Sequence, residues 1–275
     1  MEIFRLDEPE SGDGMISLKS KQEIEIMREA ARRLKQVFKE LKKSIRVGMT
    51  TLEIDQKAER LIEAQKTKPA FKGYRGYSAC VCTSINEEVV HGIPSKRKLK
   101  EGDLLSLDIG LIYEGYVSDS ARTWAIGEVS EEALELMQTA KQALYIGMAQ
   151  MKPGNRIGDL SAAIQNFVES QGFSVIRDFV GHGIGRAMHE DPQVPNYGKA
   201  GRGPKLDVGL VLAIEPMVAA GSWEVDIMDD SWTVVTRDRQ WSAHYEDTIA
   251  LTENGPENLT GAQEFEEAIE TIGVS

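Results

Sequence analysis

Cysteine is scarce in this sequence, and no long hydrophobic segment is present. The only two cysteines among 275 residues are Cys80 and Cys82, which stand too close together in an extended segment to form an ordinary disulfide. So few cysteines in a chain of this length indicate a reducing compartment. No apolar run approaches the ~18 residues that a membrane-spanning helix needs. These absences lead us to expect a cytoplasmic protein without a membrane span.

Positive charge is also in short supply. The sequence has 32 Lys and Arg against 44 Asp and Glu, which gives a net charge of −12. A surface of this sign repels phosphate backbones and anionic lipids, so we expect no direct contact with nucleic acid or a membrane. The N-terminal segment is acidic where a signal peptide would be basic and then apolar. We predict a disordered acidic tail over residues 1–15, followed by a single domain over residues 16–275.

Four helices are predicted from capping residues and from apolar periodicity. Ser20 and Glu23 form a capping box ahead of an apolar stripe with helical spacing. Thr50 and Glu53 form the same pattern ahead of a second stripe. The predicted helices begin after Ser20, Thr50, Ser130 and Gly154, and they end near Leu41, Lys66, Met151 and Gly172.

The second half of the sequence resembles the first. The second predicted helix aligns with the fourth at a shift of 106 residues, and residues 102–108 align with residues 209–215 at a shift of 107. Each half then consists of two helices followed by strands, with a carboxylate at the end of an apolar strand. We therefore predict an α+β fold of two similar halves, roughly residues 16–125 and 126–262. Helices would cover one face of a central antiparallel sheet.

Residues 104–123 predict a hairpin that brings two carboxylates together. Apolar residues alternate along the first strand, so Asp108 lies on the opposite face from them. A two-residue turn at 114–115 would place Gly110 opposite Asp119. Asp108 and Asp119 are then diagonal neighbours on one face, roughly 5–8 Å apart at Cβ. Carboxylates at that distance repel unless one takes up a proton or a cation lies between them; the alternative is two solvated aspartates on an open sheet face.

Further candidate ligands lie in the second half. Glu215 ends the strand that aligns with the first carboxylate strand, and Glu246 lies in a strand near the end of the sequence. The segment GHGIGRAMHEDP, residues 181–192, contains His182 and His189, which are two of only four histidines. Alone, such a glycine-rich segment would indicate no more than a turn. Together with the carboxylates, however, the segment indicates a histidine ligand.

Together these residues predict an oxygen-rich metal site. Its members are Asp108, Asp119, His182, Glu215 and Glu246. Carboxylate oxygens and one imidazole suit a divalent ion such as Mn, Fe or Co, and the absence of cysteine from the set argues against a structural zinc site. Four carboxylates over-compensate the charge of one ion. Two ions therefore fit better, and such a pair suits hydrolysis by a metal-held hydroxide.

The motifs that carry these residues resemble those of the type I methionine aminopeptidases, in the creatinase/aminopeptidase family. The resemblance covers roughly residues 16 to 260, through MISLKSKQEIEIMREA, CTSINEEVVHGIP, LDIGLIYEGYVSDSART, FVGHGIGRAMHEDPQVPNY, LAIEPM and SAHYEDTIALTENGPENLT. It implies the pita-bread fold, in which two pseudo-symmetric halves share a central curved antiparallel sheet covered by helices on one face. It also implies metal-dependent removal of the initiator methionine from nascent proteins, with a small second residue preferred.

The resemblance assigns a role to each site residue. Two divalent ions (Co, Mn, Fe or Zn) are implied, with Asp108 on one ion, Asp119 and Glu246 bridging both, and His182 and Glu215 completing the other. The catalytic residues would be His91, which contacts the substrate backbone, His189, which binds the scissile carbonyl, and Glu215, which transfers a proton. The methionine pocket would be lined by Tyr74, Tyr77, Cys82, Met188 and Trp232. The implied partners are the N-termini of nascent polypeptides, and the protein is expected to be a monomer. Contact with the ribosome is left open.

Two residues depart from the family pattern. Arg75 stands where histidine is frequent, and His244 stands where glutamine is frequent; we expect His244 to be exposed rather than to support a ligand.

Three other functions are alternatives. A proline-specific peptidase of the same fold usually has a large additional N-terminal domain. A binding protein that has lost its metals would lack some of the five ligands, whereas a metal-storage protein would not need His91 and His189.

Overall fold

The computed structural model describes residues 16–261 and 271–272. The predicted tail (residues 1–15) and residue 262, the predicted end of the second half, lie outside the described residues. The four predicted helices are confirmed, as α1 (Lys21–Lys42), α2 (Thr51–Ala64), α3 (Glu131–Ala149) and α4 (Ile157–Ser170). Both predicted capping boxes form, with the hydroxyls of Ser20 and Thr50 accepting a backbone N–H. Local sequence therefore sets the starts of α1 and α2.

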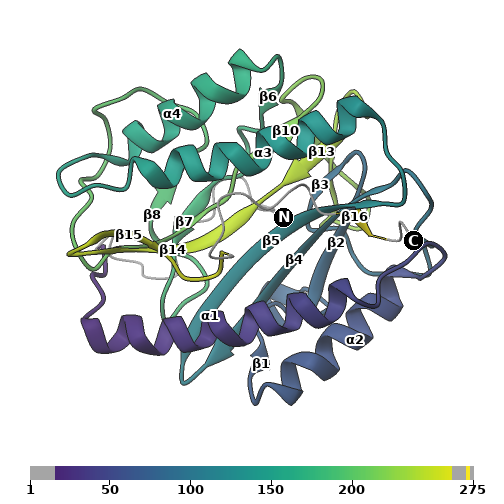
Figure 1. Ribbon diagram of the computed structural model, residues 1–275, viewed down its shortest axis with the longest axis horizontal. Coiled ribbons are helices and arrows are strands. Elements are labelled where there is room, and N and C mark those ends of the chain that lie inside the picture. Colours follow the sequence, from purple (N-terminus) through teal and green to yellow (C-terminus); the bar gives the residue numbers. More distant parts are fainter. Residues whose placement is uncertain (1–15, 262–270, 273–275) are drawn as a thin grey trace.

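A curved antiparallel sheet forms the middle of the molecule (Figure 1). Its strands are β1 (Lys68–Pro69), β2 (Val81–Ile85), β4 (Leu104–Tyr113), β5 (Tyr116–Ile126), β7 (Gly181–Gly183), β8 (Glu190–Val194), β9 (Val211–Ile214), β14 (Glu246–Thr252), β15 (Gly255–Asn258) and β16 (Thr271–Ile272). They follow the order β1-β4-β5-β14-β9-β7-β8, with β2 beside β4, β15 beside β14, and β16 parallel to β5. Smaller elements complete the fold: β3 (Glu88–Val90), β6 (Ser174–Val175), β10 (Met217–Ala219), β11 (Val225–Ile227), β12 (Val234–Thr236), β13 (Ser242–His244) and the short 3-10 helix η1 (Tyr74–Gly76).

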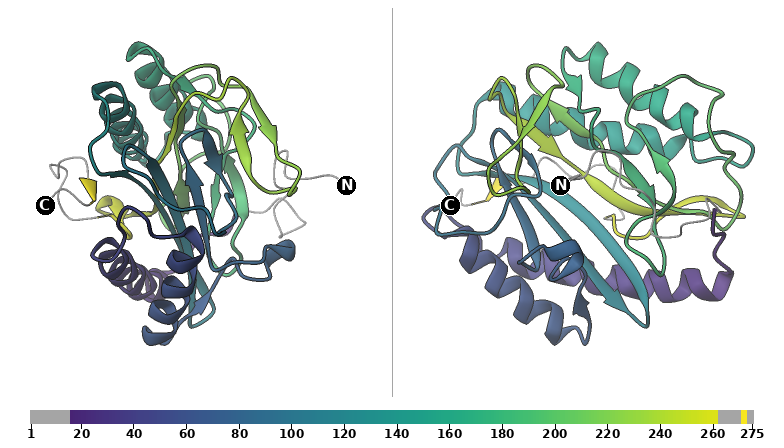
Figure 2. Two further views of the ribbon diagram at one scale, coloured as in Figure 1. Left: turned by 90° about the vertical axis from the view of Figure 1, so that its right-hand side faces the viewer. Right: turned by 180° about the vertical axis from the view of Figure 1, so that it is seen from behind.

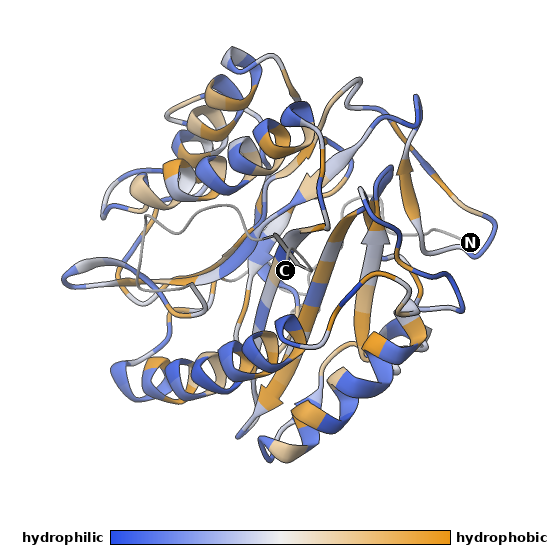
Figure 3. Ribbon diagram, turned by 45° about the vertical axis from the view of Figure 1, so that its right-hand side comes forward, coloured by the Kyte–Doolittle hydropathy of each residue, from blue (hydrophilic) through white to orange (hydrophobic). Residues whose placement is uncertain are grey.

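All four helices lie on the same face of this sheet (Figure 2, left). Apolar residues recur along each helix between polar ones (Figure 3). Leu105 and Leu107 of β4 pack in one cluster with α1 and α2, whereas Leu212 and Ile214 of β9 pack in another with α3 and α4. Each such fully buried side chain contributes about 1.5–3 kcal/mol. The predicted arrangement of two similar halves with helices over one face is confirmed.

None of the helices in residues 16–261 combines the length and the apolar character that crossing a bilayer would require.

The register of the sheet aligns acidic residues on the face that the helices leave uncovered. The predicted hairpin is confirmed, with Gly110 opposite Asp119 and Asp108 opposite Ala121. Glu246 of β14 faces Ala121 from the other side. Asp108, Ala121 and Glu246 therefore form one row across three strands. Because the side chain of alanine is a single methyl group, the row leaves space between the two carboxylates.

Candidate metal centre and active site

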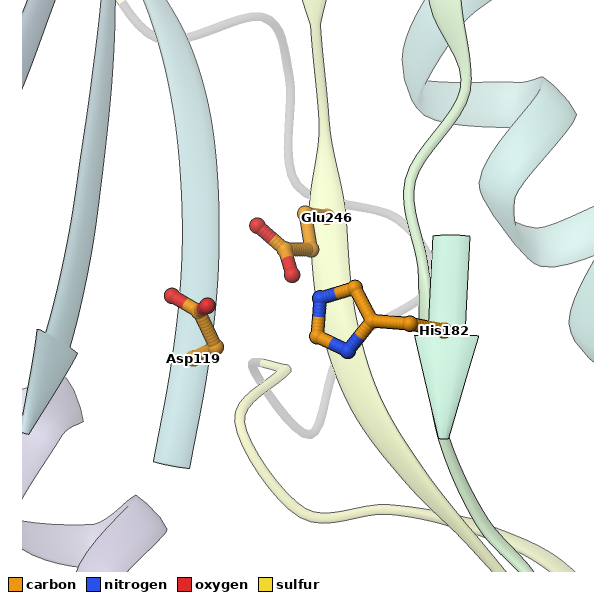
Figure 4. A group of neighbouring side chains, drawn as sticks. All are labelled: Asp119, His182 and Glu246. Carbon is orange, nitrogen blue, oxygen red and sulfur yellow. The ribbon is translucent and has the colours of Figure 1, made fainter. Parts of the chain in front are cut away.

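Five acidic and imidazole side chains meet in one cavity on this uncovered face. Asp108, Asp119, His182, Glu215 and Glu246 all line it. Figure 4 shows Asp119, His182 and Glu246 approaching one another from β5, β7 and β14, and a ligand atom of each lies within 4.8 Å of the others. Nε2 of His182 also lies 3.5 Å from Oε1 of Glu215. The structure thus brings together all five residues of the predicted metal set.

Glycines on both sides of His182 let its ring reach the carboxylates. A Cβ at Gly181 would lie 2.4 Å from the carbonyl oxygen of Ala213, and one at Gly183 would lie 2.3 Å from that of Asp191. No side chain fits at either position, so β7 can pack closely between its neighbours only with glycine there. Nδ1 of His182 lies 2.8 Å from the carbonyl oxygen of Gly183. Nδ1–H therefore donates to the backbone, which leaves the lone pair of Nε2 facing the cavity.

Burial dominates the electrostatics of the carboxylates. It raises the pKa of Asp119 to about 7 and raises the pKa values of Asp108 and Glu246 well above their usual range, with repulsion from neighbouring carboxylates adding to the last two. Oδ1 of Asp108 and Oε1 of Glu246 are buried without a hydrogen-bond partner among the described residues. Buried carboxylate oxygens that lie close together and lack donors fit a divalent cation, which would compensate their charge. The donor set of four carboxylates and a neutral imidazole also matches the ligands of divalent transition metals.

His189 lies beside this cluster and is held by a tyrosine. Its Nδ1 lies 2.6 Å from the hydroxyl oxygen of Tyr74, and its ring centre lies 4.3 Å from that of His182. Burial lowers the pKa of His189 well below its ordinary value, so the ring is neutral near pH 7. A neutral ring whose Nδ1 accepts from the Tyr74 hydroxyl carries its proton on Nε2, where it can donate to a ligand.

His91 lines the same cavity in a strained backbone conformation. Its φ is 60°, a region that few residues other than glycine occupy and that is enriched at functional sites. Its ring packs edge to face on Phe179 and Trp232, with centroids 5.6 and 6.3 Å away. Burial lowers the pKa of His91 to about 4. His91 is therefore a second neutral imidazole beside the carboxylates.

An aromatic and sulfur-containing pocket belongs to the same cavity, whose volume is about 70 Å³. It is lined by the predicted residues Tyr74, Tyr77, Cys82, Met188 and Trp232. Burial raises the pKa of Cys82 well above its usual value, so the thiol stays neutral and is a poor metal ligand. Phe71 also lines the pocket and was not predicted. The available signal was Gly110 within an apolar strand, since a Cβ there would lie 2.6 Å from the Phe71 ring.

The prediction that His244 is exposed is wrong. The residue is only 2% exposed, because β13 pairs with β10 and sets His244 opposite Met217 inside the protein. Its Nε2 lies 3.7 Å from Oε2 of Glu215, and burial lowers its pKa to about 3. A neutral imidazole therefore lies next to Oε2 of Glu215, whereas His182 lies next to Oε1. Arg75, by contrast, is exposed in η1, with its guanidinium 5.5 Å from the ring centre of Tyr74.

A second, smaller cavity of about 40 Å³ is lined in part by the same acidic residues. It shares His91, Asp108, His189 and Glu215 with the first cavity and adds Val90, Asp178, Phe179, Val180, Met217 and His244. The two cavities therefore adjoin at the acidic cluster. A ligand that crosses the cluster can place one group in each.

Known proteins resemble this chain in sequence and in fold. A methionine aminopeptidase of Clostridium acetobutylicum is 53% identical over 247 residues, which cover 90% of this chain and 99% of that protein. The solved structure of a methionine aminopeptidase from Thermotoga maritima matches with a TM-score of 0.88 and 47% identity, covering 90% of this chain and all of that one. A prolidase from Pyrococcus furiosus matches at 0.72 and 25% identity, and the match covers 66% of its length. The expected pita-bread fold is confirmed. Because a family model also matches residues 25–253, the chain belongs to metallopeptidase family M24.

Proposed function

We propose that this protein removes the N-terminal methionine from newly made polypeptides. The observation that carries the proposal is one cavity in which an acidic, metal-binding wall adjoins an aromatic and sulfur-lined pocket. Two divalent ions, drawn from Co, Mn, Fe and Zn, would be held by Asp108, Asp119, His182, Glu215 and Glu246. The relatives named methionine aminopeptidase support the same substrate.

Divalent ions held there would supply Lewis acidity, which lowers the pKa of water to near neutrality. Glu215 is placed to transfer a proton from water to the leaving amine. Its two oxygens lie 3.5 Å from Nε2 of His182 and 3.7 Å from Nε2 of His244, and its side chain is 13% exposed at the junction of the two cavities. In this position the carboxylate takes a proton from the attacking water and delivers it to the leaving amine.

The two neutral histidines act on the peptide itself. Nε2–H of His189, set by the Tyr74 hydroxyl on Nδ1, donates to the scissile carbonyl oxygen as negative charge develops there. One such donor is worth about 3 kcal/mol in the transition state. His91, fixed between Phe179 and Trp232, holds the substrate backbone next to the reacting amide.

The two cavities account for selectivity on either side of the scissile bond. The thioether of methionine finds the thiol of Cys82, the thioether of Met188 and aromatic rings, which are favourable partners for sulfur. The second residue of the substrate would enter the smaller cavity, whose 40 Å³ suits a side chain such as that of alanine. A small second residue is therefore preferred.

Substituting Met217 with alanine is expected to relax this preference. The change enlarges the smaller cavity, so the ratio of kcat/KM for Met-Leu-Ser over Met-Ala-Ser rises roughly tenfold or more. Met228→Ala is the matched control, because Met228 is 42% exposed and lies outside both cavities. An unaltered ratio in Met217→Ala would remove the smaller cavity from the specificity argument.

The substrate class is tested by stripping the protein of metal, adding back Mn, Co or Fe, and comparing Met-Ala-Ser with Xaa-Pro peptides. We expect the metal-restored protein to cleave Met-Ala-Ser at least about 100-fold faster, since the sulfur-lined pocket supplies binding that Xaa-Pro peptides do not use. Cleavage of Xaa-Pro peptides without cleavage of Met-Ala-Ser would overturn the proposed function.

We further infer that the protein works in the cytoplasm as a single-domain monomer, over residues 16–275, on chains that leave the ribosome. The few cysteines and the net charge of −12 support this location and argue against direct contact with nucleic acid.

A further inference from the structure

A buried ion pair outside the cavity joins the start of the described chain to the loop that carries Met188 and His189. Nζ of Lys19 contacts Oε2 of Glu190, and the two side chains are only 4% and 10% exposed. The same ammonium donates to the carbonyl oxygen of Ser17 at 2.9 Å. Lys19 directly precedes the cap of α1, and Glu190 directly follows His189. The contact therefore spans two segments that are far apart in the sequence.

The second oxygen of Glu190 organises the loop itself. Oε1 accepts the backbone N–H of Arg186 at 2.8 Å and that of Ala187 at 3.2 Å. One carboxylate thus folds the loop onto itself and anchors it to Lys19. Lys19 is in turn fixed through its own backbone, whose N–H donates to the carbonyl oxygen of Gly209 at 2.7 Å.

Close packing leaves this contact little room to shift. A Cβ at Gly185 would lie 2.4 Å from Cε of Lys19 and 2.6 Å from Oε1 of Glu190. The loop backbone therefore rests directly on the ion pair. The carbonyl oxygen of Gly185 also accepts the backbone N–H of Val117 in β5 at 2.8 Å, which ties the loop to the strand that carries Asp119.

We propose that Lys19 and Glu190 are positioning residues for His189 and Met188. They hold the loop of residues 184–189 so that the imidazole of His189 meets the scissile carbonyl and Met188 closes the methionine pocket. The inference rests on the function proposed above for these two side chains. Loss of one partner leaves the other as an uncompensated buried charge, and the loop then relaxes to regain solvation for it.

The test compares Lys19→Met with Lys21→Met in the full chain. Lys21 forms an ion pair with Glu253 at 2.9 Å, but those side chains are 81% and 65% exposed, and exposed pairs contribute little. We expect Lys19→Met to lower kcat for Met-Ala-Ser about 10- to 100-fold, because small displacements of catalytic groups have effects of that size. KM should rise by a smaller factor than kcat falls, since displacement of Met188 weakens the methionine pocket, whereas His189 acts on the transition state. Lys21→Met should leave kcat unchanged.

A second readout does not depend on activity. Hydrogen exchange of the backbone amides of Arg186 and Ala187 is expected to accelerate at least about tenfold in Lys19→Met and in Glu190→Gln, and to stay unchanged in Lys21→Met. Glu190→Gln keeps an oxygen for these amides but loses the charge that holds Lys19. It also serves as the second variant if Lys19→Met does not fold.

The outcomes separate this inference from the proposed function. A variant with a lower Tm but wild-type kcat and wild-type exchange at 25 °C would reduce the ion pair to a purely stabilising contact and overturn the inference. If the wild-type protein does not cleave Met-Ala-Ser, the proposed function fails. Unaltered exchange in both variants would still count against the positioning role of Lys19 and Glu190. Faster exchange together with a selective fall in kcat supports it.

Discussion

Replacing Glu246 with glutamine is expected to abolish tight metal binding and to lower kcat/KM for Met-Ala-Ser by roughly 10³-fold. The amide keeps the shape of the side chain but removes its charge, and several kcal/mol of transition-state stabilisation depend on the metal centre. Mutation of a residue that only hydrogen-bonds to a metal ligand already weakens metal binding 10- to 100-fold. We therefore expect the dissociation constant of Co or Mn to rise more than about 100-fold when Glu246, which we propose as a ligand itself, is replaced.

The change should leave the fold intact. The carbonyl oxygen of Glu246 accepts from the guanidinium of Arg122 and from the hydroxyl of Ser120 at 2.6 and 2.8 Å, and these contacts do not involve its carboxylate. Loss of this charge also removes the repulsion from Asp119, Glu215 and Asp108 that adds to burial in raising the pKa of Glu246. Isothermal titration with each metal measures the affinity, and Glu253→Gln is the matched control, because Glu253 follows the same strand but is 65% exposed. Wild-type affinity in Glu246→Gln would remove this residue from the metal site.

Short-range patterns in the sequence were sufficient to predict the hairpin at the centre of the site. Alternation of apolar residues fixed which face of β4 is buried, and the two-residue turn fixed the register to within a single residue. Asp108 and Asp119 then had to share the uncovered face. The capping boxes at Ser20 and Thr50 set the helix starts in the same way, because each depends only on residues three positions apart.

Contacts between distant segments could not be predicted in this way. His244 was misjudged because its burial depends on pairing between β13 and β10, which no local pattern specifies. Phe71 was not predicted because it reaches the pocket from a bend just after the two-residue strand β1, which pairs with β4. The buried pair of Lys19 and Glu190 joins positions 171 residues apart. The five site residues themselves were identified through several motifs together, since each carboxylate alone resembles a surface residue.

In the metal-free protein, the free energy of unfolding is expected to fall as the pH rises from 7 to 8. Asp119 has a folded-state pKa of about 7, and burial raises those of Asp108 and Glu246 well above their usual range, whereas such groups titrate near 4 in an unfolded chain. In this window the folded state holds protons that the unfolded state has released, so stability falls with pH. Each acid that stays protonated in the folded state contributes about 1.4 kcal/mol per pH unit to this fall.

The histidines change the free energy of unfolding with pH in the opposite direction, and they do so at lower pH. Burial lowers the pKa values of His91 and His182 to about 4 and that of His244 to about 3. The unfolded chain therefore holds more protons on these rings between pH 4 and 6.5, and stability there rises with pH. Above pH 7 the rings are largely neutral in both states. The interval from pH 7 to 8 therefore reports mainly on the carboxylates, to which the buried thiols of Cys80 and Cys82 add a smaller fall of the same sign, because burial raises their pKa values too.

A divalent ion should remove most of this slope above pH 7, because these carboxylates are then ionised in the ion-bound folded state as they are in the unfolded state. Binding displaces the protons from Asp108, Asp119 and Glu246, so affinity rises with pH, and a ligand that binds only the folded state stabilises it in proportion. Urea unfolding at pH 7 and 8, with chelator and then with Co or Mn, measures both slopes. Glu246→Gln, which has one fewer buried acid, should show a shallower metal-free slope. A metal-free protein equally stable at both pH values would mean that the carboxylates are ionised and compensated by the protein itself, and the cavity would then need no cation.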